Sequence, residues 1–136
     1  MPSNPYAAHL DVSILTAEPI ELVRILYRTA LDSVSAARAH LAAGEIQPRS
    51  QAINKALSVI HELALALNPK AEPTLASTLA ELYDYMQRRL LAANFEQSDA
   101  PLAEVMGLLE TMTDAWHDAN PNSGQEASDE RVLAET

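Results

Sequence analysis

The sequence predicts an all-α fold: an antiparallel up-down four-helix bundle with an N-terminal strap segment and a disordered C-terminal tail. Leucine and alanine dominate a chain that is 48% hydrophobic but only 4% aromatic, a composition typical of helical bundles. Glycine occurs only three times in 136 residues, and no strand-like alternation of apolar and polar residues is evident. Four amphipathic stretches are separated by short breaks, which favours antiparallel neighbours.

The first segment, residues 1–17, is an irregular lead-in. It carries more apolar side chains than a free tail usually has, among them Tyr6, Leu10, Ile14 and Leu15. Two interpretations remain open. The segment either docks loosely on the core, or it is a strap of these four residues that covers a binding groove.

The bundle is expected over residues 18–119, and its first helix over 19–43. Pro19 suits the first helical position because its missing N–H has no intrahelical acceptor there. Glu21 follows in the first turn, where the helix dipole favours an acid. Gly44 provides a natural stop after the last turn.

The second helix is expected over 48–67, from Pro48 to the break at Asn68 and Pro69. Its apolar residues cover about half of the helical wheel, whereas a helix buried on one side needs a stripe of roughly 100°. One neighbouring helix cannot bury such a wide arc.

The third helix is expected over 73–94 and the fourth over 100–119. Asp84 and Arg88 are spaced to pair across one turn of the third helix. Ser98 or Asp99 is expected to cap the fourth helix. Residues 120–136 are polar and acidic, and we expect them to form a disordered tail.

Composition and charge restrict the class of function. A formal net charge of −10 argues against nucleic acid or an anionic membrane as the main partner. The absence of cysteine removes disulfides and thiolate chemistry. No apolar run approaches the roughly 18 residues of a membrane span, and no signal peptide is evident. We therefore expect a cytoplasmic protein without membrane insertion.

Histidine and carboxylate patterns give no support to an enzyme, a metal site or a cofactor. A di-iron bundle needs a glutamate three residues before a histidine on two helices, and none of the four histidines has one. Asp114 and His117 come closest to that spacing. A phosphotransfer role for His61 is disfavoured because Glu62 would repel a phosphoryl group and the lysine of such modules is absent.

The excess of apolar surface is the strongest physical indication of function. A soluble protein with an unfilled apolar surface has a partner, an oligomer or a covering segment. Arg89 either packs its stem and reaches a carboxylate or anchors an incoming chain. We hypothesise that the second and third helices supply a binding groove, formed by Ile53, Leu57, Ile60, Leu67, Leu79, Tyr83, Met86, Arg89 and Leu90.

Several motifs resemble one known family in order and spacing. The third helix contains LYDYMQRRLLAAN at 82–94, which closely resembles the hallmark helix of the FliS family, the flagellin-specific export chaperones. Family-like segments also stand at 16–22 (TAEPIEL), 25–31 (ILYRTAL) and 108–116 (LLETMTDAW), and Tyr6 matches a tyrosine of the family's N-terminal lead.

The resemblance covers roughly residues 4–118, with two departures. Arg28 and Thr29 stand where the family has Asp-Gly after the tyrosine, and Glu18 replaces a serine. The first departure removes an acid through which family members could contact a partner.

The resemblance implies a cytoplasmic, ATP-independent chaperone of flagellar type III export. Such a protein binds the disordered C-terminal segment of flagellin, prevents its premature polymerisation, and passes it to the export machinery. Contacts with other flagellar regulators are also implied. The alternatives are a helical module or regulator with another client, and a homodimer whose groove is filled by its twin instead of a monomer.

Overall fold

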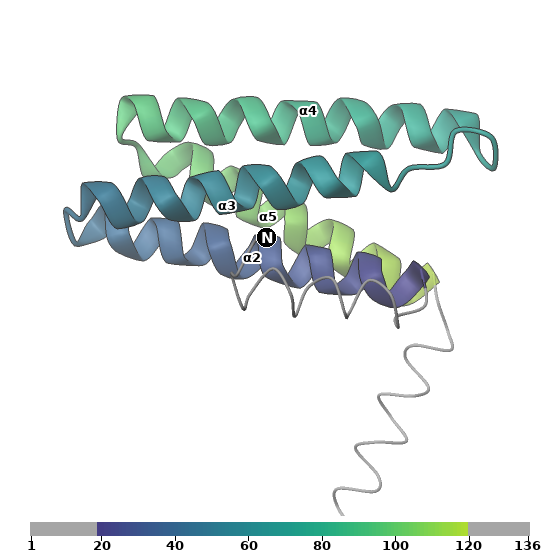
Figure 1. Cartoon of the computed structure of the whole chain (residues 1–136), viewed down its shortest axis with the longest axis horizontal. Helices are drawn as coiled ribbons and strands as arrows, with labels where there is room; N and C mark the ends of the chain where they lie inside the picture. Colours follow the sequence, from purple (N-terminus) through teal and green to yellow (C-terminus); the bar gives the residue numbers. More distant parts are fainter. Residues whose placement is uncertain (1–18, 120–136) are drawn as a thin grey trace, which may run out of the picture.

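The computed structural model describes residues 19–119, which form four helices and no strand (Figure 1). They are α2 (Pro19–Ala42), α3 (Ile46–Leu65), α4 (Pro73–Glu96) and α5 (Asp99–Ala119). The all-α class and the four predicted helices are confirmed. The predicted lead-in 1–17 and tail 120–136 lie outside the described residues.

Consecutive helices run in opposite directions. The colours of Figure 1 show α2 running from right to left, α3 back to the right, α4 to the left and α5 to the right. Each helix has two main neighbours, because α3 lies between α2 and α4, and α5 packs against the same two helices. The helices therefore close into a ring around one core, with α5 crossing obliquely behind the others.

Three helix boundaries differ from the sequence prediction by two residues. α3 ends at Leu65 instead of Leu67, with Ala66 as its C-cap. α3 begins at Ile46 instead of Pro48, because a proline is tolerated within the first turn, where backbone N–H groups lack intrahelical acceptors. α4 continues to Glu96 instead of Asn94 and ends where Gln97 adopts a left-handed conformation with φ 54°.

Left-handed residues close both turns at one end of the bundle. Gly44 has φ 72°, and its N–H donates to the carbonyl of Leu41 while the N–H of Glu45 donates to His40. After Gln97, the N–H of Ser98 donates to the carbonyl of Ala93. These bonds satisfy the last carbonyls of α2 and α4, so each chain reversal is short and well defined.

The core is aliphatic apart from two tyrosines. Small residues on α2, such as Ala30 and Ala37, have no exposed surface and let α3 and α5 approach closely. The largest fully buried side chains are Tyr27, Val34, Ile53, Ile60, Leu63, Tyr83, Met86, Leu90, Leu102, Val105 and Leu109.

Polar contacts tie α5 to its neighbours near the two short turns. Arg38 donates from Nε and Nη2 to both carboxylate oxygens of Asp99, at 2.8 and 3.0 Å. Glu104 accepts hydrogen bonds from Arg89 Nε at 2.7 Å and from the Tyr85 hydroxyl at 2.9 Å. We call this end, defined by these five residues, the clamped end.

Candidate functional site

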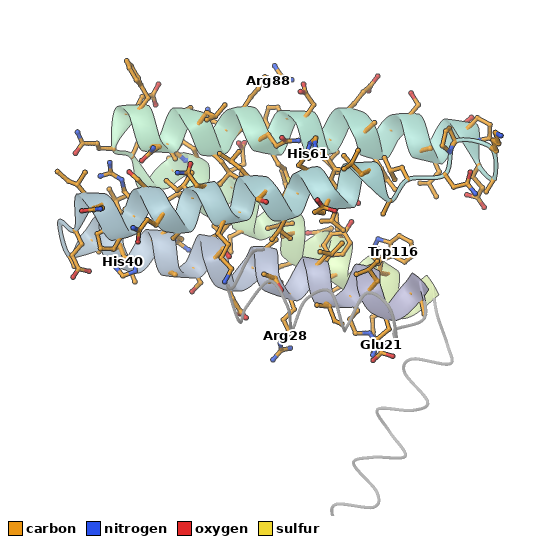
Figure 2. The ribbon with its side chains drawn as sticks, in the orientation of Figure 1. Glu21, Arg28, His40, His61, Arg88 and Trp116 are labelled. Carbon is orange, nitrogen blue, oxygen red and sulfur yellow. The ribbon has the colours of Figure 1, made fainter. Side chains whose placement is uncertain are left out.

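An apolar hollow of about 530 Å³ lies at the opposite end of the bundle, which we call the open end. All four helices and the connection at 66–72 contribute to it, and Trp116 marks its position in Figure 2. Its lining is almost entirely aliphatic or aromatic: Ile20, Val23, Leu63, Ala66, Leu67, Asn68, Ala71, Glu72, Leu75, Ala76, Leu79, Tyr83 and Trp116.

The hollow arises because the apolar stripe of each helix continues into the last turn at this end. Short alanine side chains in the connection and at the start of α4 do not fill the space between these stripes. Leu75 consequently remains 48% exposed, and Leu67 and Leu79 are half-buried. A concave apolar surface in contact with water is a binding surface for another apolar group.

A chain of hydrogen bonds lies beside the hollow, which two of its three members, Tyr83 and Trp116, line. The hydroxyls of Tyr27 and Tyr83 are 2.6 Å apart, and Trp116 Nε1 donates to the Tyr27 hydroxyl at 3.3 Å. Burial is the main cause that raises the pKa of both tyrosines above the ordinary value. The hydroxyls therefore stay neutral, and they join α2, α4 and α5 without presenting a reactive group.

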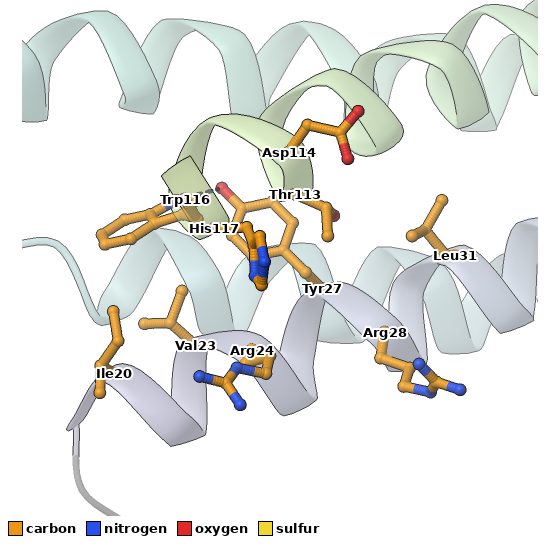
Figure 3. Close-up of a pocket in the computed structure, with 10 residues that line it drawn as sticks. All are labelled: Ile20, Val23, Arg24, Tyr27, Arg28, Leu31, Thr113, Asp114, Trp116 and His117. Carbon is orange, nitrogen blue, oxygen red and sulfur yellow. Dashed lines mark hydrogen bonds between the residues drawn. The ribbon is translucent and has the colours of Figure 1, made fainter. Parts of the chain in front are cut away.

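A second, smaller hollow of about 320 Å³ lies between α2 and α5 (Figure 3). We call it the α2–α5 cleft. It shares Ile20, Val23 and Trp116 with the first hollow, but its rim is charged. Its lining comprises Ile20, Val23, Arg24, Tyr27, Arg28, Leu31, Thr113, Asp114, Trp116 and His117.

The structure divides the predicted groove residues into two groups. The larger group is packed in the core, with at most 2% exposure: Ile53, Ile60, Tyr83, Met86 and Leu90. These side chains reach a partner only if the helices separate, with the exception of Tyr83, which also borders the open-end hollow. Leu57, Leu67 and Leu79 are half-buried, and the last two line that hollow.

Arg89 lies on the α4 side that faces α5, and its guanidinium pairs with Glu104 at 2.7 Å. A guanidinium that reaches a carboxylate is one of the two arrangements of Arg89 expected from the sequence. The predicted strap residues Tyr6, Leu10, Ile14 and Leu15 lie outside the described residues.

Sequence reasoning missed the contribution of Ile20, Val23, Leu75 and Trp116 to the hollow. The sequence did contain a signal for them. Each is an apolar residue in the terminal turns of its helix, and in an antiparallel bundle these helix ends lie at the same end of the molecule. The bond between Tyr27 and Tyr83 was also missed. Its signal was a single tyrosine within each of two otherwise aliphatic inner stripes.

The carboxylates of Asp99 and Glu104 form ion pairs between helices. Hydrogen bonds from Arg38 hold the pKa of Asp99 below its usual range, and those from Arg89 and Tyr85 do the same for Glu104. Within residues 19–119, no three metal-ligating side chains are grouped to hold an ion. The arrangement offers apolar binding surface, and the ion pairs hold the helices that carry it.

A family model described as flagellar protein FliS matches residues 2–123 of this chain. The chain belongs to the FliS family. The flagellar secretion chaperone FliS of Bacillus subtilis (strain 168) is 35% identical over 116 residues, which cover 85% of this chain and 86% of that relative. The flagellar secretion chaperone FliS of Salmonella typhimurium is 32% identical over 120 residues, 88% of this chain and 89% of the relative. That of Escherichia coli (strain K12) is 27% identical, over 81% and 82% respectively.

The family indicated by the sequence motifs is thus confirmed. FliS proteins are flagellar secretion chaperones and not enzymes, which fits a site built from apolar surface. Among the helices of residues 19–119, none combines the length and the hydropathy that a membrane crossing requires.

Proposed function

We propose that this FliS protein acts in the cytoplasm, where it binds the C-terminal segment of flagellin, prevents premature polymerisation and aids export. The open-end hollow carries this proposal. Flagellin's terminal segment is amphipathic, and an amphipathic segment binds by placing its apolar side chains in a groove of this kind. Family membership supports the export role.

The occupied surface is expected to extend from the hollow along α3 and α4. Leu75 and Leu79 of α4 and Leu67 of the connection after α3 present apolar surface and border the same space. Leu65 lies nearby at the end of α3 and is 65% exposed. Ordering a disordered client costs roughly 2–5 kcal/mol, so a long apolar contact is required to offset it.

Calorimetric titration with the C-terminal segment of flagellin from the same organism tests the proposal. We expect submicromolar 1:1 binding with a large negative heat-capacity change, because apolar surface is buried. Absence of binding, also after removal of residues 1–16, would contradict it.

A matched pair of variants locates the site. Leu75 and Leu91 both lie on α4 and are 48% and 56% exposed, but only Leu75 lines the hollow. We expect Leu75→Ser to weaken flagellin binding roughly tenfold, the equivalent of losing part of a leucine burial. Leu91→Ser is the control, and equal losses in the two variants would place the client elsewhere.

The lead-in gives a second part of the proposal. If Tyr6, Leu10, Ile14 and Leu15 occupy the hollow when no client is present, the apparent affinity for the client falls with the covered fraction. Removing residues 1–16 should then tighten flagellin binding. An unchanged or weaker affinity would count against the strap.

A further inference from the structure

Glu72 is the one charged side chain among the described residues that line the open-end hollow. It directly precedes α4 and is exposed to solvent. The connection that carries it joins α3 to α4 at this end of the bundle (Figure 1). The other lining residues are uncharged, so the negative charge of this carboxylate has no counterpart within the hollow.

A further hollow of about 560 Å³ adjoins the open-end hollow at the start of α4, and we call it the side hollow. The two hollows share Ala71, Glu72 and Leu75, and Glu72 is again the one charged lining residue. A segment that binds across both hollows therefore passes Glu72. The lining of the side hollow comprises Ala71, Glu72, Pro73, Thr74, Leu75 and Thr78.

The fold itself makes little use of the Glu72 carboxylate. Glu72 is the N-cap residue of α4, but its side chain makes no capping hydrogen bond, and serine, threonine, aspartate and asparagine are the residues that cap well. The ion pairs between side chains of residues 19–119 do not include it, although Lys70 is only two residues away. A carboxylate that stabilises no described neighbour, set in an apolar lining, is available to a bound segment.

The end of α3 adds to the negative potential at the hollow. Ala66 and Leu67, which directly follow α3, line the hollow, and the last turn of α3 contains no basic residue. The negative end of this helix dipole is therefore not neutralised locally. The start of α4 carries a partial positive charge of about half an elementary charge, which the full charge of the carboxylate exceeds.

We propose that the open-end hollow selects a segment with a lysine or arginine next to its apolar side chains, and that Glu72 pairs with this cation. Because the occupant is the client of the proposed function, the assignment rests on that function and adds the charge of the residue that reaches the hollow. The long stem of the cation lies over apolar lining such as Leu75. An acidic residue at the same position is repelled, so Glu72 also rejects wrong segments.

Calorimetric titration with the C-terminal segment of flagellin tests the role of the carboxylate. Glu72→Gln should weaken binding about two- to fivefold, the usual effect of losing one solvent-exposed ion pair. Glu81→Gln is the matched control, since Glu81 is an exposed acid of the same helix that lines neither hollow. Unchanged binding in Glu72→Gln, or an equal loss in both variants, would overturn the proposal.

Substitutions in the client identify the cation. Each lysine and arginine of the flagellin segment is replaced by glutamine in turn, and one replacement should weaken binding to the wild type but have little further effect in Glu72→Gln. Charge reversal gives the complementary result, because Glu72→Lys should regain affinity for a client in which that residue is glutamate. If no basic residue of the client couples to Glu72, the pairing is wrong.

A probe pair tests the charge preference of the hollow without flagellin. Trp116 is the only tryptophan of the chain and lines the hollow, so its fluorescence reports binding of octylammonium and of octyl sulfate at concentrations below micelle formation. The wild type should prefer octylammonium, and Glu72→Gln but not Glu81→Gln should reduce that preference about two- to fivefold. Equal preferences in the wild type and Glu72→Gln would contradict the proposal.

The two sets of measurements separate the client from the charge preference. If flagellin fails to bind the wild type while the probe preference depends on Glu72, the proposed client is wrong and the hollow still selects a cation. If flagellin binds and neither measurement depends on Glu72, the client stands and the charge selection is wrong.

Discussion

The two ends of the bundle are built from the same four helices. They differ in the contacts that hold the helices together and in how much of the inward-facing apolar surface is buried. At the clamped end, short turns and ion pairs bring the helices together, and Arg38, Arg89 and Glu104 fix α5 against α2 and α4. At the open end the connection at 66–72 is longer, and hydrogen bonds through the Tyr27 hydroxyl join α2 to α4 and α5.

This difference shows how a small bundle can be stable and still keep apolar surface in contact with water. In the clamped half, inward-facing leucines such as Leu90 and Leu102 are fully buried, and the exposed apolar residues Ile46, Leu91 and Phe95 line neither the hollow nor the cleft. The open half carries the same residue types with half of their surface exposed, as at Leu75. Stability and binding are therefore expected to depend on different residues of the same helix.

The largest expected effect is on stability in the clamped half. Leu90→Ala should lower the unfolding free energy by about 2–5 kcal/mol, because it leaves a cavity in a tightly packed region. Urea denaturation monitored by circular dichroism measures the loss. Leu79→Ala, at a half-buried position of the open end, should cost less, and equal costs would contradict the comparison.

The next effect concerns the link that holds the open end together. Tyr27→Phe leaves the Tyr83 hydroxyl and the Trp116 indole N–H without their partner, and should cost about 1–3 kcal/mol. Tyr83→Phe should cost less, since Tyr27 still accepts from Trp116. Thermal unfolding of both single variants and the double variant gives the coupling between the hydroxyls; additive losses would show that there is none.

A smaller effect is expected from acid at the clamped end. The pKa values of Asp99 and Glu104 are lowered in the folded protein, so the unfolded chain binds more protons once the pH falls below about 4. The stability that these pairs contribute is present above that pH and is lost as the pH falls through the folded-state pKa values. Urea midpoints measured from pH 6 down to about pH 3 should fall less steeply in Asp99→Asn/Glu104→Gln than in the wild type.

The smallest effect on stability is expected at the rim of the hollow. Leu75→Ser should change the unfolding free energy by no more than about 0.5 kcal/mol, because the side chain is already half exposed. The same urea experiment measures it. A loss comparable to that of Leu90→Ala would show that this leucine belongs to the core.

Hydrophobic periodicity was sufficient to predict the helices, because their ends carry proline, glycine and asparagine at positions with a defined local role. It was insufficient to separate core from groove. Leu90 and Leu75 are both apolar residues of the third helix, yet one is fully buried and the other is 48% exposed. Their burial depends on their position along the helix axis. α5 crosses obliquely and moves away from α4 toward the open end, where Leu75 lies (Figure 1).

Gly107 lies on the exposed side of α5, between Glu104 in the clamp and Trp116 at the open end, and a methyl group there would meet nothing within 4 Å. A glycine within a helix weakens it by roughly 0.5–1 kcal/mol relative to alanine. Gly107 therefore separates a segment of α5 held by the ion pairs of Asp99 and Glu104 from a segment held by core packing and by the Trp116 hydrogen bond. Backbone amides after Gly107 should exchange with solvent deuterium sooner than those before it, through local openings that leave the rest of the bundle folded.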